Sequence, residues 1–251
     1  MGIGARVIGS GEHKVIVVHD WFGTAESWGS FLDYLDGSQF TYAFIDVRGY
    51  GSRKDVEGEY TLEEIATDVL ALADELGWQT FSLVGHSMGG KAVQRVLGDA
   101  SDRVTKLVGL TPVPAAKYPM PDEQFGAFAA SAQTPQIRRA LLDTLTGKRA
   151  HGVWLDRMVQ HSIDTSKPEA YGKYLQSWVH TDFVADIHGN ETPIKVIVGE
   201  HDPATPAALI EATWLKFYPN AQLEVLANAG HYPMYETPVA LAGAIESFLK
   251  D

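Results

Sequence analysis

Short apolar runs that alternate with helical patterns are the feature that most restricts the fold of this chain. We interpret these runs as buried strands. They cover residues 15–18, 42–45, 81–84, 106–110, 194–198 and 223–226, and residues 6–8 are a weaker candidate. Strands this apolar need cover on both faces, and helical patterns separate them along the chain. The pattern therefore predicts parallel strands with helices on both sides.

The clearest helix is expected between the second and third of these strands. Apolar residues recur at helical spacing from residue 62 to residue 76 and form one stripe of an amphipathic helix. Thr61 and Glu64 have the spacing of a capping box, and Gly77 stands where the helix should end. This alternation predicts a doubly wound, mostly parallel α/β sheet, whose sites lie on loops at the carboxyl ends of strands.

The stretch from residue 111 to residue 192 breaks the alternation. It contains helical patterns punctuated by prolines and no convincing strand. An insertion of this length is too long for a loop in a compact domain. We therefore predict a core domain of residues 1–110 and 193–251, with a helical cap of residues 111–192 inserted before the strand near residue 194.

The pentapeptide Gly-His-Ser-Met-Gly at residues 85–89 follows a predicted strand directly and opens a helical pattern. This context is typical of a nucleophile elbow, a tight turn that strains the serine backbone and exposes its hydroxyl. The positions two before and two after the serine must be small, and Gly85 and Gly89 meet that requirement. A helix N-terminus also offers an N–H group and partial positive charge to a developing oxyanion. Ser87 is therefore predicted to be a nucleophile.

A serine nucleophile needs a base, and the base needs an acid that orients it. Asp202 and His231 each follow a predicted strand, so both are expected at the same edge of the sheet. The chain order Ser87, Asp202, His231 is the order expected on this fold. Glu200, which is near Asp202 in the chain, and Asp182 and Asp186, which precede the strand before it, remain alternatives for the acid.

The segment His-Asp-Trp-Phe-Gly at residues 19–23 follows the first strong strand, where a second oxyanion donor should lie. Together with residues 46–51, 85–90, 199–202 and 230–231, it resembles the α/β-hydrolase superfamily. The similarity is to the branch of small cofactor-free esterases, haloperoxidase-like enzymes and related lactone hydrolases. These motifs span nearly all the chain outside the cap and are more specific for the fold than for the substrate.

The resemblance assigns roles residue by residue. It implies a nucleophile, a base, an orienting acid and two backbone oxyanion donors, which are Ser87, His231, Asp202, Trp21 and Met88. Asp20 departs from the pattern, because the family usually has glycine there, and Phe22 is the alternative to Trp21 as donor. The resemblance implies no cofactor, and no His-Glu-x-x-His or other metal-ligand spacing is found.

A serine at the elbow indicates acyl chemistry, since haloalkane dehalogenases and epoxide hydrolases of this fold have aspartate there. The cap is rich in aromatic residues and methionine, part of which we attribute to ordinary helix packing. The others are expected to line an apolar acyl or alcohol pocket. The pocket candidates are Phe22, Phe125, Phe128, Trp154, Met158 and Trp178.

The leading hypothesis is a serine hydrolase that cleaves a small, fairly hydrophobic carboxylic ester or lactone through an acyl-enzyme. One alternative is a carbon–carbon bond hydrolase that uses the same triad. Another is a ligand-sensing protein whose turnover is slow or absent. The sequence leaves the oligomeric state and the natural substrate open.

The charge balance and the absence of cysteine exclude several other classes. The formal net charge of −12 argues against a nucleic-acid partner and against docking on an anionic membrane. With no cysteine, thiolate metal sites and cysteine nucleophiles are impossible. Since the first residues lack an apolar signal segment, we expect a soluble, cytoplasmic protein.

Overall fold

The computed structural model describes residues 3–250, which form a seven-stranded sheet in the order β1-β3-β2-β4-β5-β6-β7. The strands are β1 (Ala5–Gly9), β2 (His13–Val18), β3 (Phe40–Ile45), β4 (Phe81–His86), β5 (Val104–Leu110), β6 (Ile194–Gly199) and β7 (Ala221–Leu226). β1 pairs antiparallel with β3, and all other neighbours are parallel. The predicted doubly wound α/β sheet is confirmed, including the weak candidate strand at residues 6–8.

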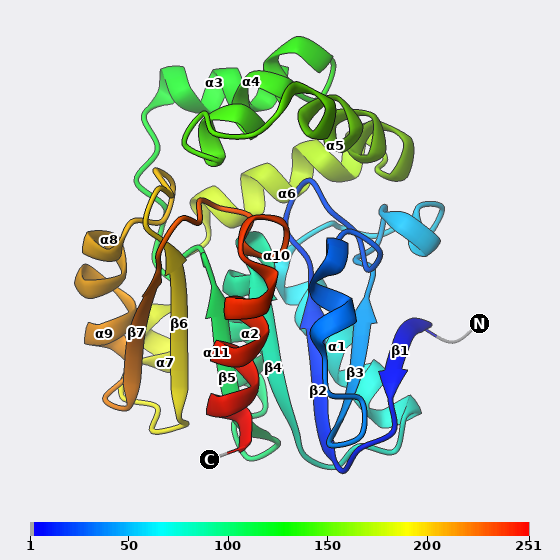
Figure 1. Cartoon of the computed structure of the whole chain (residues 1–251), viewed down its shortest axis with the longest axis vertical. Helices are drawn as coiled ribbons and strands as arrows, with labels where there is room; N and C mark the ends of the chain where they lie inside the picture. The colour runs from blue at the N-terminus through cyan, green and yellow to red at the C-terminus, as the bar shows by residue number, and fades with distance from the viewer. Residues whose placement is uncertain (1–2, 251) are drawn as a thin grey trace.

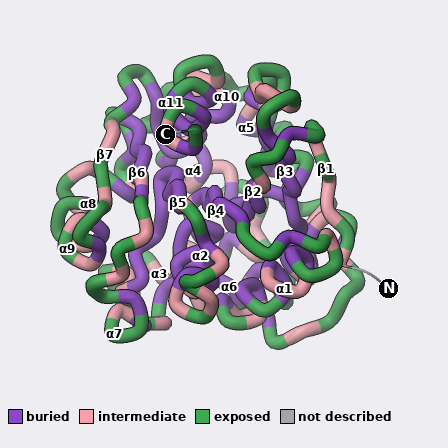
Figure 2. The backbone as a smooth tube through the Cα atoms, turned by 90° about the horizontal axis from the view of Figure 1, so that it is seen from below, coloured by how far each residue is buried: buried purple, intermediate pink, exposed green. Residues whose placement is uncertain are grey.

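Helices cover both faces of this sheet (Figure 1). One face carries α1 (Leu62–Glu75), α2 (Met88–Asp99) and α7 (Val184–Ile187), and the other carries the 3-10 helix η1 (Gly29–Tyr34) and α11 (Pro238–Lys250). The shorter elements are η2 (Gly51–Arg53), α8 (Ala207–Ala212), α9 (Trp214–Phe217) and α10 (Pro233–Glu236). β3 and β4 are buried along their whole length, and Figure 2 shows the buried centre of the sheet between the two helix layers.

Local sequence accounts for the boundaries of α1. The Thr61 hydroxyl accepts the Glu64 N–H at 3.2 Å, as the capping-box spacing predicted. The apolar stripe is buried against the sheet, and Gly77 has a φ of 71°, a conformation open to glycine at a helix end.

The segment between β5 and β6 contains α3 (Asp122–Ala130), α4 (Pro135–Leu145), α5 (Gly152–Thr165) and α6 (Pro168–His180). These helices lie beyond the carboxyl ends of the strands (Figure 1). Pro135 and Pro168 stand in the first turns of α4 and α6, where their missing N–H is not needed.

A buried lysine ties this helical segment to the core. Lys91, on α2, has no exposed surface, and its Nζ donates to the carbonyl oxygens of Ala116 at 2.9 Å, Trp178 at 3.0 Å and Thr181 at 2.6 Å. Trp178 and Thr181 lie at the C-terminal end of α6, where carbonyl groups lack helical donors. Lys91 therefore supplies donors to the end of α6 from the helix that follows Ser87.

Candidate active site

Ser87 lies in the tight turn between β4 and α2, with φ 54° and ψ −113°. Residues other than glycine rarely adopt such a positive φ, so the surrounding structure must hold the Ser87 backbone in this conformation. The Ser87 N–H donates to the Leu110 carbonyl at 3.0 Å. A Cβ atom on Gly85 would lie 2.4 Å from the Gly89 oxygen, and one on Gly89 would lie 2.4 Å from the Val18 oxygen. The two glycines therefore let the turn close against β2.

The structure brings together the three side chains predicted to form a triad. His231 Nε2 lies 2.9 Å from Ser87 Oγ, and His231 Nδ1 lies 2.8 Å from Asp202 Oδ2. The Thr205 hydroxyl also donates to Asp202 Oδ2 at 2.6 Å, and the Ala204 N–H donates to Oδ1 at 2.8 Å. Since a carboxylate only accepts, His231 carries its hydrogen on Nδ1 and presents Nε2 to the serine.

The pKa shifts of His231 and Asp202 suit a base and the acid that orients it. Burial alone would lower the pKa of His231, but the charge and hydrogen bond of Asp202 raise it above the ordinary 6.5. Burial would raise the pKa of Asp202, whereas His231, the Thr205 hydroxyl and backbone N–H donors hold it below the ordinary 3.8. Asp202 is therefore ionised and can stabilise a proton taken up by His231.

Met88 and Trp21 are the residues predicted to offer backbone N–H groups to an oxyanion. Met88 is the first residue of α2, and Trp21 lies in the loop after β2. Within residues 3–250 neither N–H has a protein acceptor, whereas the Phe22 N–H donates to Asp20 Oδ2 at 3.2 Å. Since Phe22 is already engaged, the geometry favours Trp21 and Met88 as the oxyanion donors.

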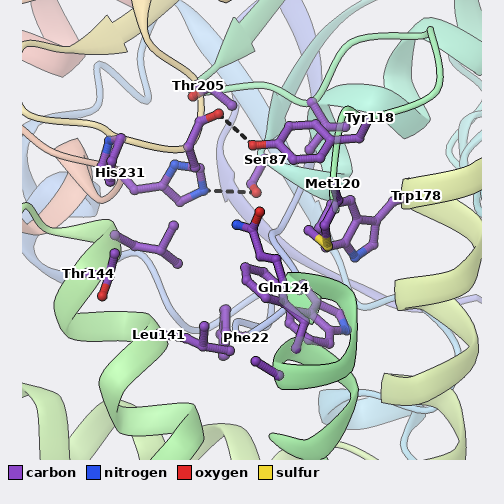
Figure 3. A pocket seen from close by; sticks show the side chains of 17 residues that line it. Phe22, Ser87, Tyr118, Met120, Gln124, Leu141, Thr144, Trp178, Thr205 and His231 are labelled. Carbon is purple, nitrogen blue, oxygen red and sulfur yellow. Dashed lines mark hydrogen bonds between the residues drawn. The ribbon is translucent and has the colours of Figure 1, made fainter. Parts of the chain in front are cut away.

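A cavity of about 230 Å³ opens over Ser87 and His231, between the core loops and the helices beyond them (Figure 3). Its other lining residues are mostly apolar, and they include Trp21, Phe22, Val113, Tyr118, Met120, Gln124, Phe128, Leu141, Leu145 and Trp178. Figure 3 shows the carboxamide of Gln124 pointing toward Ser87. The Tyr118 hydroxyl is turned to the wall, where it donates to the Ala204 oxygen at 2.7 Å.

The predicted pocket residues divide into two groups. Phe22, Phe128 and Trp178 line the cavity above Ser87. Trp154 and Met158 line a separate hollow, because α5 lies over the loop that leads into η1. The Phe125 ring packs against His180 of α6, with 5.1 Å between ring centroids, and does not line the cavity. The structure thus corrects the expected placement of these last three residues.

Sequence reasoning missed other lining residues, chiefly Met120, Gln124, Leu141 and Leu145. It counted aromatic side chains and therefore passed over the glutamine and the leucines. Helical spacing was the available signal, since Gln124 is four residues before Phe128 and Leu141 is four before Leu145.

The described part of the chain, residues 3–250, contains no group of histidine and carboxylate residues that could hold a metal ion. None of its helices is both long enough and apolar enough to cross a membrane.

Comparison with known proteins places the chain in a family. A profile described as alpha/beta hydrolase fold matches residues 14–238, and the chain belongs to that family. It is 28% identical to the esterase YbfF of Escherichia coli over 246 residues, 94% of this chain and 93% of the relative. It is 25% identical to 3-oxoadipate enol-lactonase 2 of Acinetobacter baylyi over 252 residues, which cover 96% and 91% of the two chains.

A bromoperoxidase from Bacillus anthracis has the same fold, with a TM-score of 0.87 at 22% identity. The match covers 98% of this chain and 94% of that structure. The predicted resemblance to the branch of esterases and haloperoxidase-like proteins is therefore confirmed, and membership of a hydrolase family is established.

Proposed function

We propose that this protein is a serine hydrolase that cleaves small, largely apolar carboxylic esters through an acyl-enzyme. The observation that carries the proposal is the hydrogen-bonded chain from Ser87 through His231 to Asp202 beneath the cavity. The esterase among the relatives supports the same reaction class.

In the first half of the reaction, Ser87 Oγ attacks the acyl carbon while His231 Nε2 takes the hydroxyl proton. The carbonyl oxygen becomes an oxyanion and accepts hydrogen bonds from the N–H groups of Trp21 and Met88. When the carbon–oxygen bond to the alcohol breaks, His231 returns the proton to the leaving oxygen. The acyl group is then bonded to Ser87.

In the second half, a water molecule attacks the acyl carbon and gives its proton to His231. Collapse of the second oxyanion breaks the bond to Ser87 Oγ, which takes the proton back. Ionised Asp202 stabilises the protonated imidazole in both halves without being protonated itself.

The cavity lining supports a substrate with an apolar acyl or alcohol part. Phe128 and Leu141 offer it only hydrocarbon surface, while Gln124 places one polar group near the reacting centre. Lactones undergo the same cleavage because they are cyclic esters, and the enol-lactonase among the relatives favours them as a second substrate class.

The decisive test compares Ser87→Ala with Ser247→Ala, an exposed serine of α11, on p-nitrophenyl esters. Ser87→Ala is expected to lower kcat by about 10⁴ to 10⁶, because no other group forms the acyl-enzyme. Ser247→Ala should behave as the wild type. A fluorophosphonate should label Ser87, as mass spectrometry of peptides would show.

Turnover by Ser87→Ala close to that of the wild type, or a label on another serine, would contradict the proposal. Stoichiometric acylation of Ser87 without turnover would indicate a ligand-sensing protein instead. Cleavage of a vinylogous diketone with no turnover of any ester or lactone would indicate a carbon–carbon bond hydrolase.

A further inference from the structure

Asp20 is a buried carboxylate that takes no direct part in the proposed reaction. It lies in the loop after β2 and is 4% exposed. Burial alone would raise its pKa, but His86, His19 and the Tyr232 hydroxyl together hold it well below the ordinary range. Asp20 is therefore ionised, and a charge buried at this depth needs partners that stay in place.

The carboxylate of Asp20 joins two loops that meet at the site. Asp20 Oδ2 accepts the Phe22 N–H at 3.2 Å and the Tyr232 hydroxyl at 2.9 Å. Phe22 belongs to the loop with the candidate oxyanion donor Trp21, and Tyr232 directly follows His231. One charged group thus spans the loop that would bind the oxyanion and the loop that carries the base.

The His86 ring lies between Asp20 and the backbone of His231. Asp20 Oδ1 lies 3.7 Å from His86 Nδ1, and His86 Nε2 donates to the His231 carbonyl oxygen at 2.8 Å. The Thr111 hydroxyl donates to the same oxygen at 3.2 Å. The backbone of His231 is therefore held from the side on which Asp20 lies.

The peptide between Asp20 and Trp21 has its orientation fixed by His19. His19 Nε2 accepts the Val47 N–H at 3.2 Å, so Nδ1 carries a hydrogen and donates it to the Asp20 carbonyl oxygen at 2.7 Å. In a trans peptide, the C=O group and the following N–H point in opposite directions. The Trp21 N–H is therefore directed away from His19.

The next peptide is held at both of its polar groups. The Trp21 carbonyl oxygen accepts the Tyr50 hydroxyl at 3.0 Å, and the Phe22 N–H donates to the Asp20 carboxylate. Without that acceptor, the Phe22 N–H would be buried and unpaired, and the peptide could rotate to satisfy it. Such a rotation would also move Trp21.

We propose that Asp20 is a positioning residue: its carboxylate binds the Phe22 N–H and the Tyr232 hydroxyl and so fixes the Trp21 N–H relative to His231. The inference rests on the proposed serine hydrolysis, in which the donor and the base must act on one acyl group. Asp20 itself touches no reacting atom.

The test compares Asp20→Ala with Asp20→Asn on a p-nitrophenyl ester. Asp20→Ala removes the oxygen that accepts both bonds. It is expected to lower kcat about 10- to 100-fold while KM changes less than about twofold, because the oxyanion is bound only after attack. Asp20→Asn keeps an oxygen that can accept both bonds, so its kcat should stay within about threefold of the wild type.

Tyr232→Phe provides a second variant that keeps the ring and removes one of the two bonds. It is expected to lower kcat about 3- to 10-fold, again with little change in KM. The double variant Asp20→Ala/Tyr232→Phe should lose no more than Asp20→Ala alone, because both changes break the same link. Additive losses would contradict this link.

Structures of the phosphonate adducts provide a readout that does not depend on turnover. In the wild type, the phosphonyl oxygen should contact the N–H groups of Trp21 and Met88. Contact with the Phe22 N–H instead would overturn the inference. Unchanged kcat in Asp20→Ala, or equal losses in Asp20→Ala and Asp20→Asn, would also overturn it.

The same experiments separate this inference from the proposed function. If the wild type cleaves no ester and Ser87 takes no label, the proposed function fails and the role of Asp20 fails with it. If the wild type is active and Asp20→Ala matches it, only the role of Asp20 fails.

Discussion

The carboxylate of Asp202 is held in one orientation by hydrogen bonds. Its two oxygens accept hydrogen bonds from His231, Thr205 and Ala204, so little freedom remains for its side chain. We expect Asp202→Asn to lower kcat about 10²- to 10⁴-fold with little change in KM, because the carboxylate stabilises the imidazolium of the transition state. Steady-state kinetics on a p-nitrophenyl ester measures both constants.

Asp182 and Asp186 supply matched controls for this substitution. Asp182 accepts the N–H groups of Lys117 and Val184, and Asp186 pairs with Arg95 at 2.6 Å, all away from His231. Asparagine at either position should leave kcat within about twofold of the wild type. A large loss at Asp182 or Asp186, with none at Asp202, would assign the acid to the segment between β5 and β6.

The pH dependence of the reaction should report the pKa of His231. Nε2 acts as a base only in the neutral ring, so kcat/KM should fall as the pH drops through a pKa that Asp202 raises above 6.5. Asp202→Asn removes the charge that raises this pKa, and the acid limb should then move to lower pH. Rates of the wild type and of Asp202→Asn, measured from about pH 5 to about pH 9, give the acid limb of each protein. An unchanged limb in the variant would contradict this coupling.

Residue chemistry was predictable from the sequence wherever a motif encodes backbone geometry. Ser87, Asp202 and His231 each follow a strand, and the structure brings them within hydrogen-bond distance. The bond from the Phe22 N–H to the Asp20 carboxylate is a local contact across two residues. The link from Asp20 to Tyr232 was not predictable, because Tyr232 is 212 residues farther along the chain and meets Asp20 only through the fold. Contacts of this kind carry no local sequence signal.

Among the helices, α5 and α6 differ in what they present to the cavity. Trp178 on α6 lines it, whereas Trp154 on α5 packs against Tyr232 and Tyr235. We expect Trp178→Ala to shift preference toward bulkier acyl or alcohol groups and to cost small substrates about 1–3 kcal/mol of transition-state binding. The measurement is kcat/KM across p-nitrophenyl esters of rising chain length.

Trp154→Ala is the control for this effect. It should change every ester in the series by the same factor, because it removes packing without opening the cavity. If Trp178→Ala also changes every ester by the same factor, neither tryptophan sets substrate size.

The end of α6 should depend on Lys91. Lys91→Met keeps an unbranched chain but leaves three carbonyl groups, one buried and two partly buried, without the donor that Lys91 supplies. We expect a loss of about 2–4 kcal/mol in the free energy of unfolding, measured with urea. Lys54→Met is the matched control, since Lys54 is only partly buried and donates to a single carbonyl group. Equal stability of the wild type and Lys91→Met would contradict a tethering role.

Elements in the core were easier to predict than those beyond the sheet. The strands and α1 have local patterns that agree with their burial, down to the bond between Thr61 and Glu64. The faces of α3 and α5 were not predictable, because Phe125 and Trp154 have the same apolar character whether they meet another helix or a cavity. Tertiary packing decides between those outcomes.

For the whole molecule, the net charge of −12 implies self-repulsion in the folded state. Raising NaCl from about 10 mM to about 200 mM should therefore raise Tm by a few degrees, since it screens that repulsion. Within the described chain, the cavity lining contains no Asp, Glu, Lys or Arg side chain. The kcat for an uncharged ester should accordingly change by less than about twofold.

Calorimetry at several salt concentrations tests the prediction, with KCl as a check against an effect specific to sodium. A Tm that falls with added salt would show that favourable ion pairs outweigh the excess negative charge. In that case the distribution of charge, and not its total, would govern stability.

The helices beyond the sheet occupy a connection that the fold requires in any case. β5 and β6 are parallel neighbours, so the chain must cross from the carboxyl end of one to the start of the other. A longer connection between β5 and β6 interrupts no other element of the core and leaves the order of strands in the sheet unchanged. Over evolutionary time this segment can therefore lengthen, shorten or be exchanged by recombination while the triad loops are inherited unchanged. A lineage could acquire new substrates by altering one continuous stretch of its gene.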